Sequence, residues 1–336
     1  MDVVRIDRDH GLADWSAALR QRRRAVRELL RLFDEQVRSG IGTAGALALK
    51  NAVSGLNQVM GSRYRDEAEL IAEASEVALA DVIVANLAYD LAQAAGCTAV
   101  VVNGERGPLH FRNLDWRFPG TALRRHATAL HVKDRFSVIG WPGQFGVLTG
   151  MAPGRFSVTV NYVVHARDSG FKAVAWQAVK GFLPVEWAVR DVLEEARSFA
   201  QACSMLRRVP LVAPALFTVA GVREDEMAVI ERSATEAGVR KPRNGVLCAT
   251  NHYLSRKLAA AGVDTCEGDS EVRYAAAAAR APRVRSVEEA FALLSDGDLE
   301  REDTQYQSAF EPASGRMWAR VRGRPIEEVS ARRRDG

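Results

Sequence analysis

The chain changes character at one point, between Gly96 and Cys97, and no linker marks the change. Before this point apolar residues recur at helical spacing, and after it short strand-like runs alternate with turns rich in Gly and Pro. No stretch rich in Pro, Gly or Ser separates the two textures. The sequence therefore predicts a helical segment, residues 1–96, that runs directly into a second part, residues 97–336.

The first part predicts helices over residues 15–37, 43–60, 66–77 and 80–94, with a break near Ala78. In the first of them Leu19, Val26 and Phe33 fall on one apolar stripe. We interpret the apolar stripes as core-facing surfaces. For residues 43–60 the alternative is a face that docks peripherally on a membrane.

The second part predicts strands over 98–103, 108–116, 128–133, 135–141 and 155–164, a helical section over 184–208, and further strands over 215–222, 226–232 and 245–251. A helical region and a closing hairpin, residues 305–323, follow. Helices, strands, helices and strands in this order predict a layered α+β fold, with sheets packed between layers of helices.

Composition excludes several classes of protein. The net charge of +4 is spread too thinly to predict a nucleic-acid partner. The six His residues show no metal-ligand spacing, and the four Cys residues form no C-x-x-C pair, so we expect no metal, no cofactor and no disulfide framework. The chain has no apolar h-region and no membrane-spanning stretch, and we expect a reduced, cytoplasmic setting.

Cys97 is unusual because it follows a glycine and opens a strand-like run, AGCTAVVV. Glycine has no Cβ, so a neighbouring thiol can approach the Gly96 carbonyl closely. Attack by the Cys97 thiol would move the acyl group from nitrogen to sulfur, and hydrolysis of that thioester would release the α-amine of Cys97. An α-amine titrates near ~7.7–8.0 and a thiol near ~8.5, so the amine is a suitable base for the thiol.

The other cysteines predict no chemistry. Cys203 and Cys248 fall in helical and strand-like runs and are expected to be small buried residues, and Cys266 lies in a polar loop. A Cys–His pair with His252 is an alternative way to activate Cys97, but it requires the imidazole to reach the thiol.

Six segments carry a family resemblance: GCTAVVVN at Cys97, HFRNLDW at 110–116, GQFGVLTGMAPGRFSVTVN at 143–161, LPVEWAVRDVLEEA, LVAPALFTVAGV, and CATNHY at 248–253. Over about Gly61–Tyr253 the chain resembles acid ceramidase and N-acylethanolamine acid amidase, within the choloylglycine-hydrolase and penicillin-acylase set of N-terminal-nucleophile enzymes. DSEVRY at 269–274 and the closing hairpin are more similar to the acyl-coenzyme A:6-aminopenicillanate acyltransferase branch. The resemblance implies a four-layer αββα sandwich preceded by the helical segment.

The same resemblance implies roles for individual residues. Cys97 would be the nucleophile and Gly96–Cys97 the self-cleaved bond, with Arg112 beside the thiol and Asp115 holding the released amine. Asn251 would donate to the oxyanion, a contribution typically worth ~2.7–4 kcal/mol. Further implied neighbours of the substrate and oxyanion are Asn161, Tyr162 and Arg273.

Each of these residues also has a plainer interpretation. Arg112 and Asp115 could form a surface ion pair, Asn251 could cap a turn, and Arg273 could be an ordinary helix charge. Tyr162 stands where acid ceramidase-type enzymes carry Glu. Because a tyrosine does not titrate in the acid range, we expect activity near neutral pH.

Three functions follow from these patterns. The first is a self-cleaving cysteine amidohydrolase acting on a small N-acyl amide with an apolar acyl group, its two pieces staying together as an α/β heterodimer. The second keeps the thioester but passes the acyl group to an amine, as an acyltransferase. The third is a non-catalytic binding protein whose chain stays whole.

Overall fold

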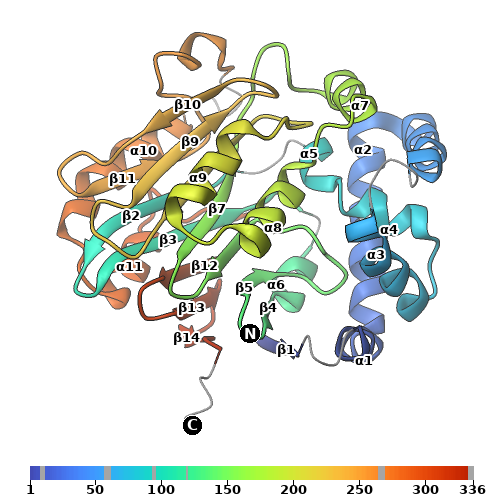
Figure 1. Ribbon diagram of the computed structural model, residues 1–336, viewed down its shortest axis with the longest axis horizontal. Coiled ribbons are helices and arrows are strands. Elements are labelled where there is room, and N and C mark those ends of the chain that lie inside the picture. The colour runs from blue at the N-terminus through green and yellow to red at the C-terminus, as the bar shows by residue number, and fades with distance from the viewer. Residues whose placement is uncertain (8–11, 57–61, 93–95, 119, 264–268, 332–336) are drawn as a thin grey trace.

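A computed structural model describes residues 1–7, 12–56, 62–92, 96–118, 120–263 and 269–331. Two β-sheets lie face to face in the middle of the molecule and helices cover both outer faces (Figure 1). Val101 from one sheet and Leu216 from the other belong to the same buried cluster between the sheets. The predicted αββα sandwich is confirmed.

The larger sheet has eight strands in the order β1-β4-β5-β6-β7-β8-β9-β10. Their bounds are β1 Asp2–Ile6, β4 Thr128–Val132, β5 Phe136–Gly140, β6 Thr149–Ala152, β7 Phe156–Tyr162, β8 Ala215–Ala220, β9 Met227–Arg232 and β10 Ala237–Arg240. Neighbours pair antiparallel except β1 and β4, which are parallel. Sequence patterns did not predict the short strands β1, β6 and β10.

The smaller sheet has the order β11-β2-β3-β12-β13-β14. Its strands are β2 Thr98–Gly104, β3 Gly107–Asp115, β11 Val246–Ala249, β12 Thr304–Glu311, β13 Arg316–Val321 and β14 Glu327–Glu328. Strands β12 and β13 form the predicted closing hairpin. Strand β2, which Cys97 directly precedes, lies inside the sheet between β11 and β3 and is almost entirely buried.

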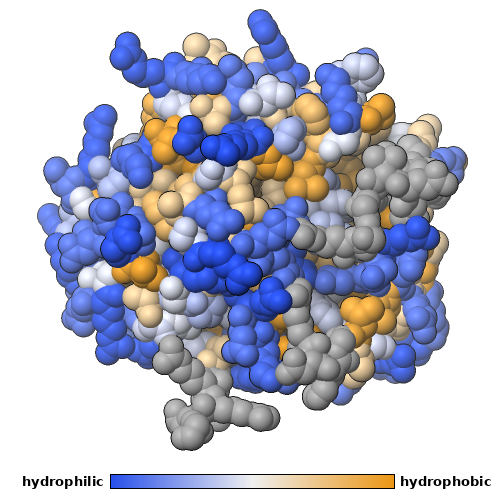
Figure 2. Space-filling view, viewed as in Figure 1, coloured by the Kyte–Doolittle hydropathy of each residue, from blue (hydrophilic) through white to orange (hydrophobic). Residues whose placement is uncertain are grey.

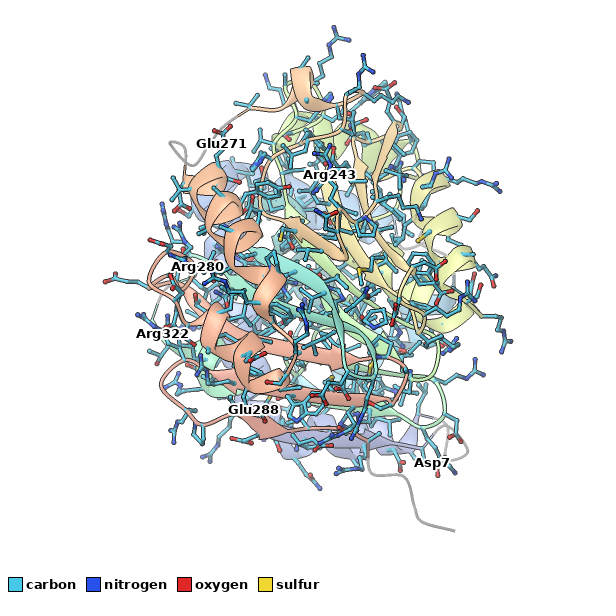
Figure 3. All side chains as sticks on the ribbon, turned by 90° about the vertical axis from the view of Figure 1, so that its left-hand side faces the viewer. Asp7, Arg243, Glu271, Arg280, Glu288 and Arg322 are labelled. Atoms are coloured by element: carbon cyan, nitrogen blue, oxygen red, sulfur yellow. The ribbon has the colours of Figure 1, made fainter. Side chains whose placement is uncertain are left out.

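Two pairs of helices form the outer layers. Helices α8 (Val185–Glu195) and α9 (Phe199–Arg208) pack on the eight-stranded sheet. Helices α10 (Asp269–Arg280) and α11 (Val287–Leu294) pack on the six-stranded sheet. Figure 3 views this second layer from outside, with Glu271 and Arg280 at opposite ends of α10. Short helices α6 (Ala122–His126) and α7 (Phe171–Val179) lie in the connections.

The first part of the chain forms a helical group at one side of the sandwich (Figure 1). Its helices are α1 Ala13–Gln21, α2 Arg23–Leu56, α3 Ser62–Ser75, α4 Leu79–Ala85 and α5 Ala88–Ala92. Gly42 interrupts α2 with φ 75°, a conformation that favours glycine. The predicted helix break near Ala78 is confirmed, since α4 begins directly after it.

Helices α4 and α5 attach the first part to the second through buried polar groups. Asn86 donates to the Gly143 carbonyl at 3.0 Å and accepts from the Phe145 N–H at 2.9 Å. Asp90 accepts from the Val185 N–H at 3.4 Å, at the start of α8, next to the buried carboxyl of Glu186. The two parts therefore share a buried core.

The surface seen in Figure 2 is mainly hydrophilic, with apolar side chains in small scattered groups. Within the described ranges, no helix is long and apolar enough to cross a membrane. On α2, Ala46 is buried while Leu47 is 60% exposed, so this helix has one face in the core and an apolar side chain outside. Peripheral membrane contact by residues 43–60 stays a prediction, and residues 57–61 lie outside the described residues.

Candidate active site

Cys97 lies at the entrance to the buried strand β2, with no exposed surface. Its Sγ is 3.8 Å from the backbone oxygen of Asp115, the last residue of β3. The same oxygen accepts the Gly96 N–H at 3.0 Å. The antiparallel register of β2 and β3, in which Thr98 faces Asn113, brings these residues together. The Gly96–Cys97 peptide is thus fixed beside the end of β3.

Three side chains hold the backbone of Cys97. Its N–H donates to Asn251 Oδ1 at 2.9 Å, and its carbonyl accepts from Arg273 Nη1 at 2.7 Å and from Asn161 Nδ2 at 3.2 Å. Asn161 lies near the end of β7, in the larger sheet, and its side chain extends to the smaller sheet. Arg273 lies on α10. All three are buried. Asn251 therefore contacts the scissile peptide itself, whereas Arg273 and Asn161 contact the next peptide, between Cys97 and Thr98.

Asn251 is itself tightly held. Its Oδ1 also accepts from Arg273 Nη2 at 2.8 Å, and its Nδ2 donates to the Tyr162 carbonyl at 2.7 Å. Its backbone N–H donates to Ser270 Oγ at 2.8 Å. In the uncut chain the nitrogen of Cys97 thus donates to Asn251, although the sequence predicted Asp115 as the residue that holds this nitrogen. The Asn251 Nδ2 group, predicted to donate to an oxyanion, donates instead to the Tyr162 carbonyl.

Arg112 projects from β3 into the space between the sheets. Its Nη1 donates to the Leu148 carbonyl at 3.0 Å and to Thr149 Oγ1 at 2.9 Å, whereas its buried Nη2 has no hydrogen-bond partner among the described residues. Arg112 and Asp115 are both fully buried, which excludes the surface ion pair. Three residues apart on a strand, they belong to opposite faces of the sheet.

Asp115 is held by the strand next to its own. Its Oδ1 accepts from Thr304 Oγ1 at 2.6 Å, since β12 pairs with β3 so that Thr304 faces Asp115. Its Oδ2 is buried and has no hydrogen-bond partner among the described residues. One carboxylate oxygen is therefore free to take a proton.

Burial sets the protonation of these groups. It raises the pKa of the Cys97 thiol, and the Arg112 guanidinium opposes that shift. Burial also raises the pKa of Asp115 to about 7, with the Arg273 guanidinium opposing. In the uncut chain at neutral pH the thiol is protonated, and both forms of the Asp115 carboxyl are populated.

Arg301 is a site residue that sequence reasoning did not find. A Cβ on Gly96 would lie 3.5 Å from Arg301 Nε and 3.7 Å from Arg273 Nη2. Asp303 accepts from Arg301 Nε at 2.9 Å, and Asp269 accepts from both arginines, at 2.9 Å from Arg273 Nε and at close range from Arg301 Nη1. An ionic network thus lies against the residue before the scissile bond.

Tyr89 is a second residue that the patterns missed. It comes from α5 of the first part and packs edge-on against Trp116 and Tyr162, with ring centroids at 5.6 and 6.5 Å. Burial raises the pKa of its hydroxyl, and the Cys97 thiol adds to that shift. Its sequence context, an apolar helical run, gave no signal that separates it from an ordinary core tyrosine.

The remaining candidates lie apart from this chemistry. Burial raises the pKa of Cys203 and Cys248 to about 12, as fits inert thiols, and Cys266 lies outside the described residues. His252 Nδ1 lies 2.8 Å from Ser270 Oγ and 3.2 Å from Thr250 Oγ1. In the part of the chain that the structure describes, no group of three or more His, Cys, Asp or Glu could hold a metal ion.

Comparison with known families places the chain in one of them. The family of acyl-coenzyme A:6-aminopenicillanic acid acyl-transferase matches residues 102–324. The chain belongs to this acyl-transferase family. The matched range covers strands β3 to β13 and helices α6 to α11, and it begins within β2, after Cys97.

Relatives of this acyl-transferase family member include amidases. The N-acylethanolamine-hydrolyzing acid amidase of Mus musculus is 30% identical over 187 residues, 54% of this chain and 50% of the relative. Acid ceramidase of Heterocephalus glaber is 28% identical over 194 residues, 52% and 48% of the two chains. The chain spans about half the length of these curated relatives.

A solved structure shares the fold. The N-acylethanolamine-hydrolyzing acid amidase ortholog of Caenorhabditis elegans superposes with a TM-score of 0.53 and 23% identity, over 65% of this chain and 93% of the other. The resemblance to the acid ceramidase and N-acylethanolamine acid amidase group, drawn from six sequence segments, is confirmed.

Proposed function

We propose that this chain cuts itself between Gly96 and Cys97 and then hydrolyses the amide bond of an N-acyl substrate through a thioester on Cys97. The observation that carries the proposal is the set of contacts around Cys97. Asn251 holds its N–H, which belongs to the scissile peptide, and Arg273 and Asn161 hold its carbonyl in the next peptide. The charges of Arg112 and Asp115 act on the thiol, whose Sγ lies 3.8 Å from the backbone oxygen of Asp115.

The first step is self-cleavage. Asp115 takes the proton of the Cys97 thiol, and the sulfur attacks the Gly96 carbonyl carbon. The carbon–nitrogen bond breaks and the Cys97 nitrogen takes a proton, which leaves a thioester and a free α-amine. Water then cleaves the thioester to give the Gly96 carboxylate and the thiol. Arg112, whose charge favours the thiolate, assists both steps.

The second step uses the α-amine so formed. The amine takes the thiol proton, the thiolate attacks the acyl carbonyl of the substrate, and the amine portion leaves with a proton. Water resolves the acyl-enzyme and releases a carboxylic acid. The names of the amidase and ceramidase relatives support this reaction class, and we keep the apolar acyl group as part of the proposal.

The two pieces are proposed to remain one α/β heterodimer. Strand β1 of the first part pairs with β4 through backbone hydrogen bonds, and the side chains of Asn86 and Asp90 form hydrogen bonds with the second part. None of these contacts depends on the peptide bond at Gly96.

Intact-mass spectrometry of freshly purified protein tests self-cleavage. We expect one fragment that ends at Gly96 and one that begins at Cys97, and an uncut chain for Cys97→Ala. Cys203→Ala, which changes a thiol outside the site, should be cut like the wild type. A wild-type chain that stays whole at every pH supports the non-catalytic binding protein and removes this proposal.

An acyltransferase is the second candidate, and the family match favours it. It shares the thioester and differs only in whether an amine or water resolves it. Incubating a cleaved N-acyl amide with a second amine separates the two: exchange of the amine indicates transfer, and release of the free acid alone indicates hydrolysis.

A further inference from the structure

Arg301 lies next to Gly96, the residue whose carbonyl is attacked, yet it belongs to none of the segments that carry the family resemblance. An atom placed as Cβ on Gly96 would meet Arg301 at 3.5 Å through Nε and at 3.7 Å through Cδ. These distances are those of ordinary van der Waals contact. The side chain of Arg301 therefore forms one wall of the space around the scissile bond.

Packing alone does not hold that wall in place. On its other side Arg301 lines an open cavity of about 540 Å³, and 28% of its side chain is exposed. The other residues that line the cavity are Arg117, Phe118, Gly120, Arg124, Glu302, Asp303 and Gln305. A long side chain that borders such a cavity keeps one position only if its charged end is bound.

Two carboxylates bind that end. Asp303 accepts from Nε at 2.9 Å and Asp269 accepts from Nη1. Asp269 also accepts from Arg273 Nε at 2.9 Å, so one carboxylate joins the two guanidinium groups. The backbone N–H of Arg301 donates to Thr304 Oγ1 at 3.0 Å, and that hydroxyl in turn donates to Asp115.

Arg301 is thus linked to both halves of the site. Through Asp269 it fixes Arg273, which holds the Cys97 carbonyl and Asn251. Through Thr304 it is connected to the carboxyl of Asp115, the proposed base. It also borders the space where a side chain on Gly96 would begin, so three separate observations converge on Arg301.

We propose that Arg301 is a positioning residue for self-cleavage: together with Asp269 it holds Gly96 and Arg273 in the arrangement from which the Cys97 thiol attacks. The inference rests on the proposed function, because it concerns the same bond. Arg301 does not exchange protons in the reaction. It limits the movement of the acyl carbon and of the groups around it, and small displacements of reacting atoms slow a reaction strongly.

The charge of Arg301 gives a signature that a merely structural role lacks. The Asp115 carboxyl has its pKa lowered by Arg301 and raised by Asp303. If the ionised carboxyl takes the thiol proton, Arg301→Gln moves the midpoint of the pH–rate profile upward. Asp303→Asn removes an anchor of Arg301 and a negative charge, so it slows cleavage while moving the midpoint downward.

The experiment follows cleavage of the full chain over time by intact-mass spectrometry across a range of pH. We expect Arg301→Gln to slow cleavage by at least about tenfold, the effect of ~1.4 kcal/mol, with the midpoint raised. Arg301→Lys keeps the charge and should restore the midpoint, but not the full rate. Arg280→Gln is the matched control: it removes two exposed ion pairs at the far end of α10 and should change neither quantity (Figure 3).

Each outcome decides the matter. Cleavage of Arg301→Gln at the wild-type rate overturns the inference and leaves the proposed function intact. A slower rate in all three site variants with an unmoved midpoint also overturns it, because it indicates a general loss of packing, which the melting temperature would show. A wild-type chain that is never cut overturns the proposed function, and the inference with it.

Discussion

Arg273 and Asn251 share a hydrogen bond, from Nη2 to Oδ1 at 2.8 Å, and the same amide oxygen accepts the Cys97 N–H. The guanidinium also reaches the Cys97 carbonyl through Nη1. One arginine therefore binds Cys97 on both sides, directly at its oxygen and through Asn251 at its nitrogen. From the sequence alone, Arg273 could equally have been an ordinary helix charge.

Arg273→Gln should slow self-cleavage by about tenfold to hundredfold, because hydrogen bonds from a charged group contribute roughly 1.5–3 kcal/mol. The rate is measured by intact mass at fixed pH. Arg273→Lys keeps the charge but not the paired donors and should recover only part of the rate. An unchanged rate in Arg273→Gln would show that the hydrogen bonds from Arg273 to the Cys97 carbonyl and to Asn251 play no part in the chemistry.

Self-cleavage should depend on pH through Asp115. The pKa of about 7 means that the carboxyl gains its basic form as the pH rises through neutrality, so the rate should rise there and level off above it. Asp115→Asn should slow cleavage by about 10²-fold or more and flatten the profile.

Thr304→Val tests the same assignment with the carboxyl in place. The Thr304 hydroxyl donates to Asp115 Oδ1 at 2.6 Å and stabilises the ionised form. Its removal raises the pKa of Asp115, so the pH–rate midpoint should move upward while the plateau is kept. A midpoint that stays where it is in the wild type would argue that another group is the base.

The stability of the uncut Cys97→Ala chain should fall as the pH rises from about 4 to about 8. Burial raises the pKa of Asp90 to about 7 and that of Glu186 to about 8, the latter also through the neighbouring Asp90 charge. In the unfolded chain both groups ionise near ~4. The folded state therefore binds more protons in this window, and the free energy of unfolding declines with pH.

Asp90→Asn and Glu186→Gln, made in the same Cys97→Ala chain, should each make that decline shallower, since an amide does not ionise. Melting temperatures at a series of pH values give the comparison. Asp134→Asn, an exposed carboxyl in a turn, is the control and should leave the slope unchanged. Parallel slopes in all four proteins would mean that the two buried carboxyls titrate normally.

Gly146→Ala should destabilise the protein by about 1–3 kcal/mol. A Cβ at this position would lie 2.5 Å from both Cβ and Oε2 of Glu186 and 3.3 Å from the Trp187 ring, with no space to yield. Gly297→Ala, where no atom lies within 4 Å, is the matched control. Urea unfolding of the two variants provides the measurement, and equal midpoints would contradict the expected clash.

Sequence reasoning located the parts of the site that follow one another along the chain. Cys97 directly precedes β2, while Arg112 and Asp115 lie on β3, and a tight turn joins the two strands, so their nearness follows from the hairpin alone. Arg301 and Thr304 enter through the pairing of β12 with β3. That pairing joins residues far apart in the sequence, and no local pattern fixes its register.

The layers of the fold were also predictable, because helical and strand periodicities alternate in long blocks. The role of Tyr89 was not, since it depends on where α5 packs against the sandwich. The contacts of Asn251 differ most from what the sequence predicted. Its amide oxygen holds the Cys97 N–H before any cut is made, an arrangement of the uncut chain that the family resemblance did not contain.

Strand β1 lies beside β4 with five residue pairs in register, although helices α1 to α5, strands β2 and β3 and helix α6 lie between them in the sequence. A cut at Gly96 would leave this ladder untouched and turn an intramolecular pairing into an association of two polypeptides. The melting temperature of the cut protein would then depend on its concentration. Refolding of the cut protein would become a bimolecular reaction, whereas the uncut chain refolds in a unimolecular reaction because β1 and β4 belong to one polypeptide.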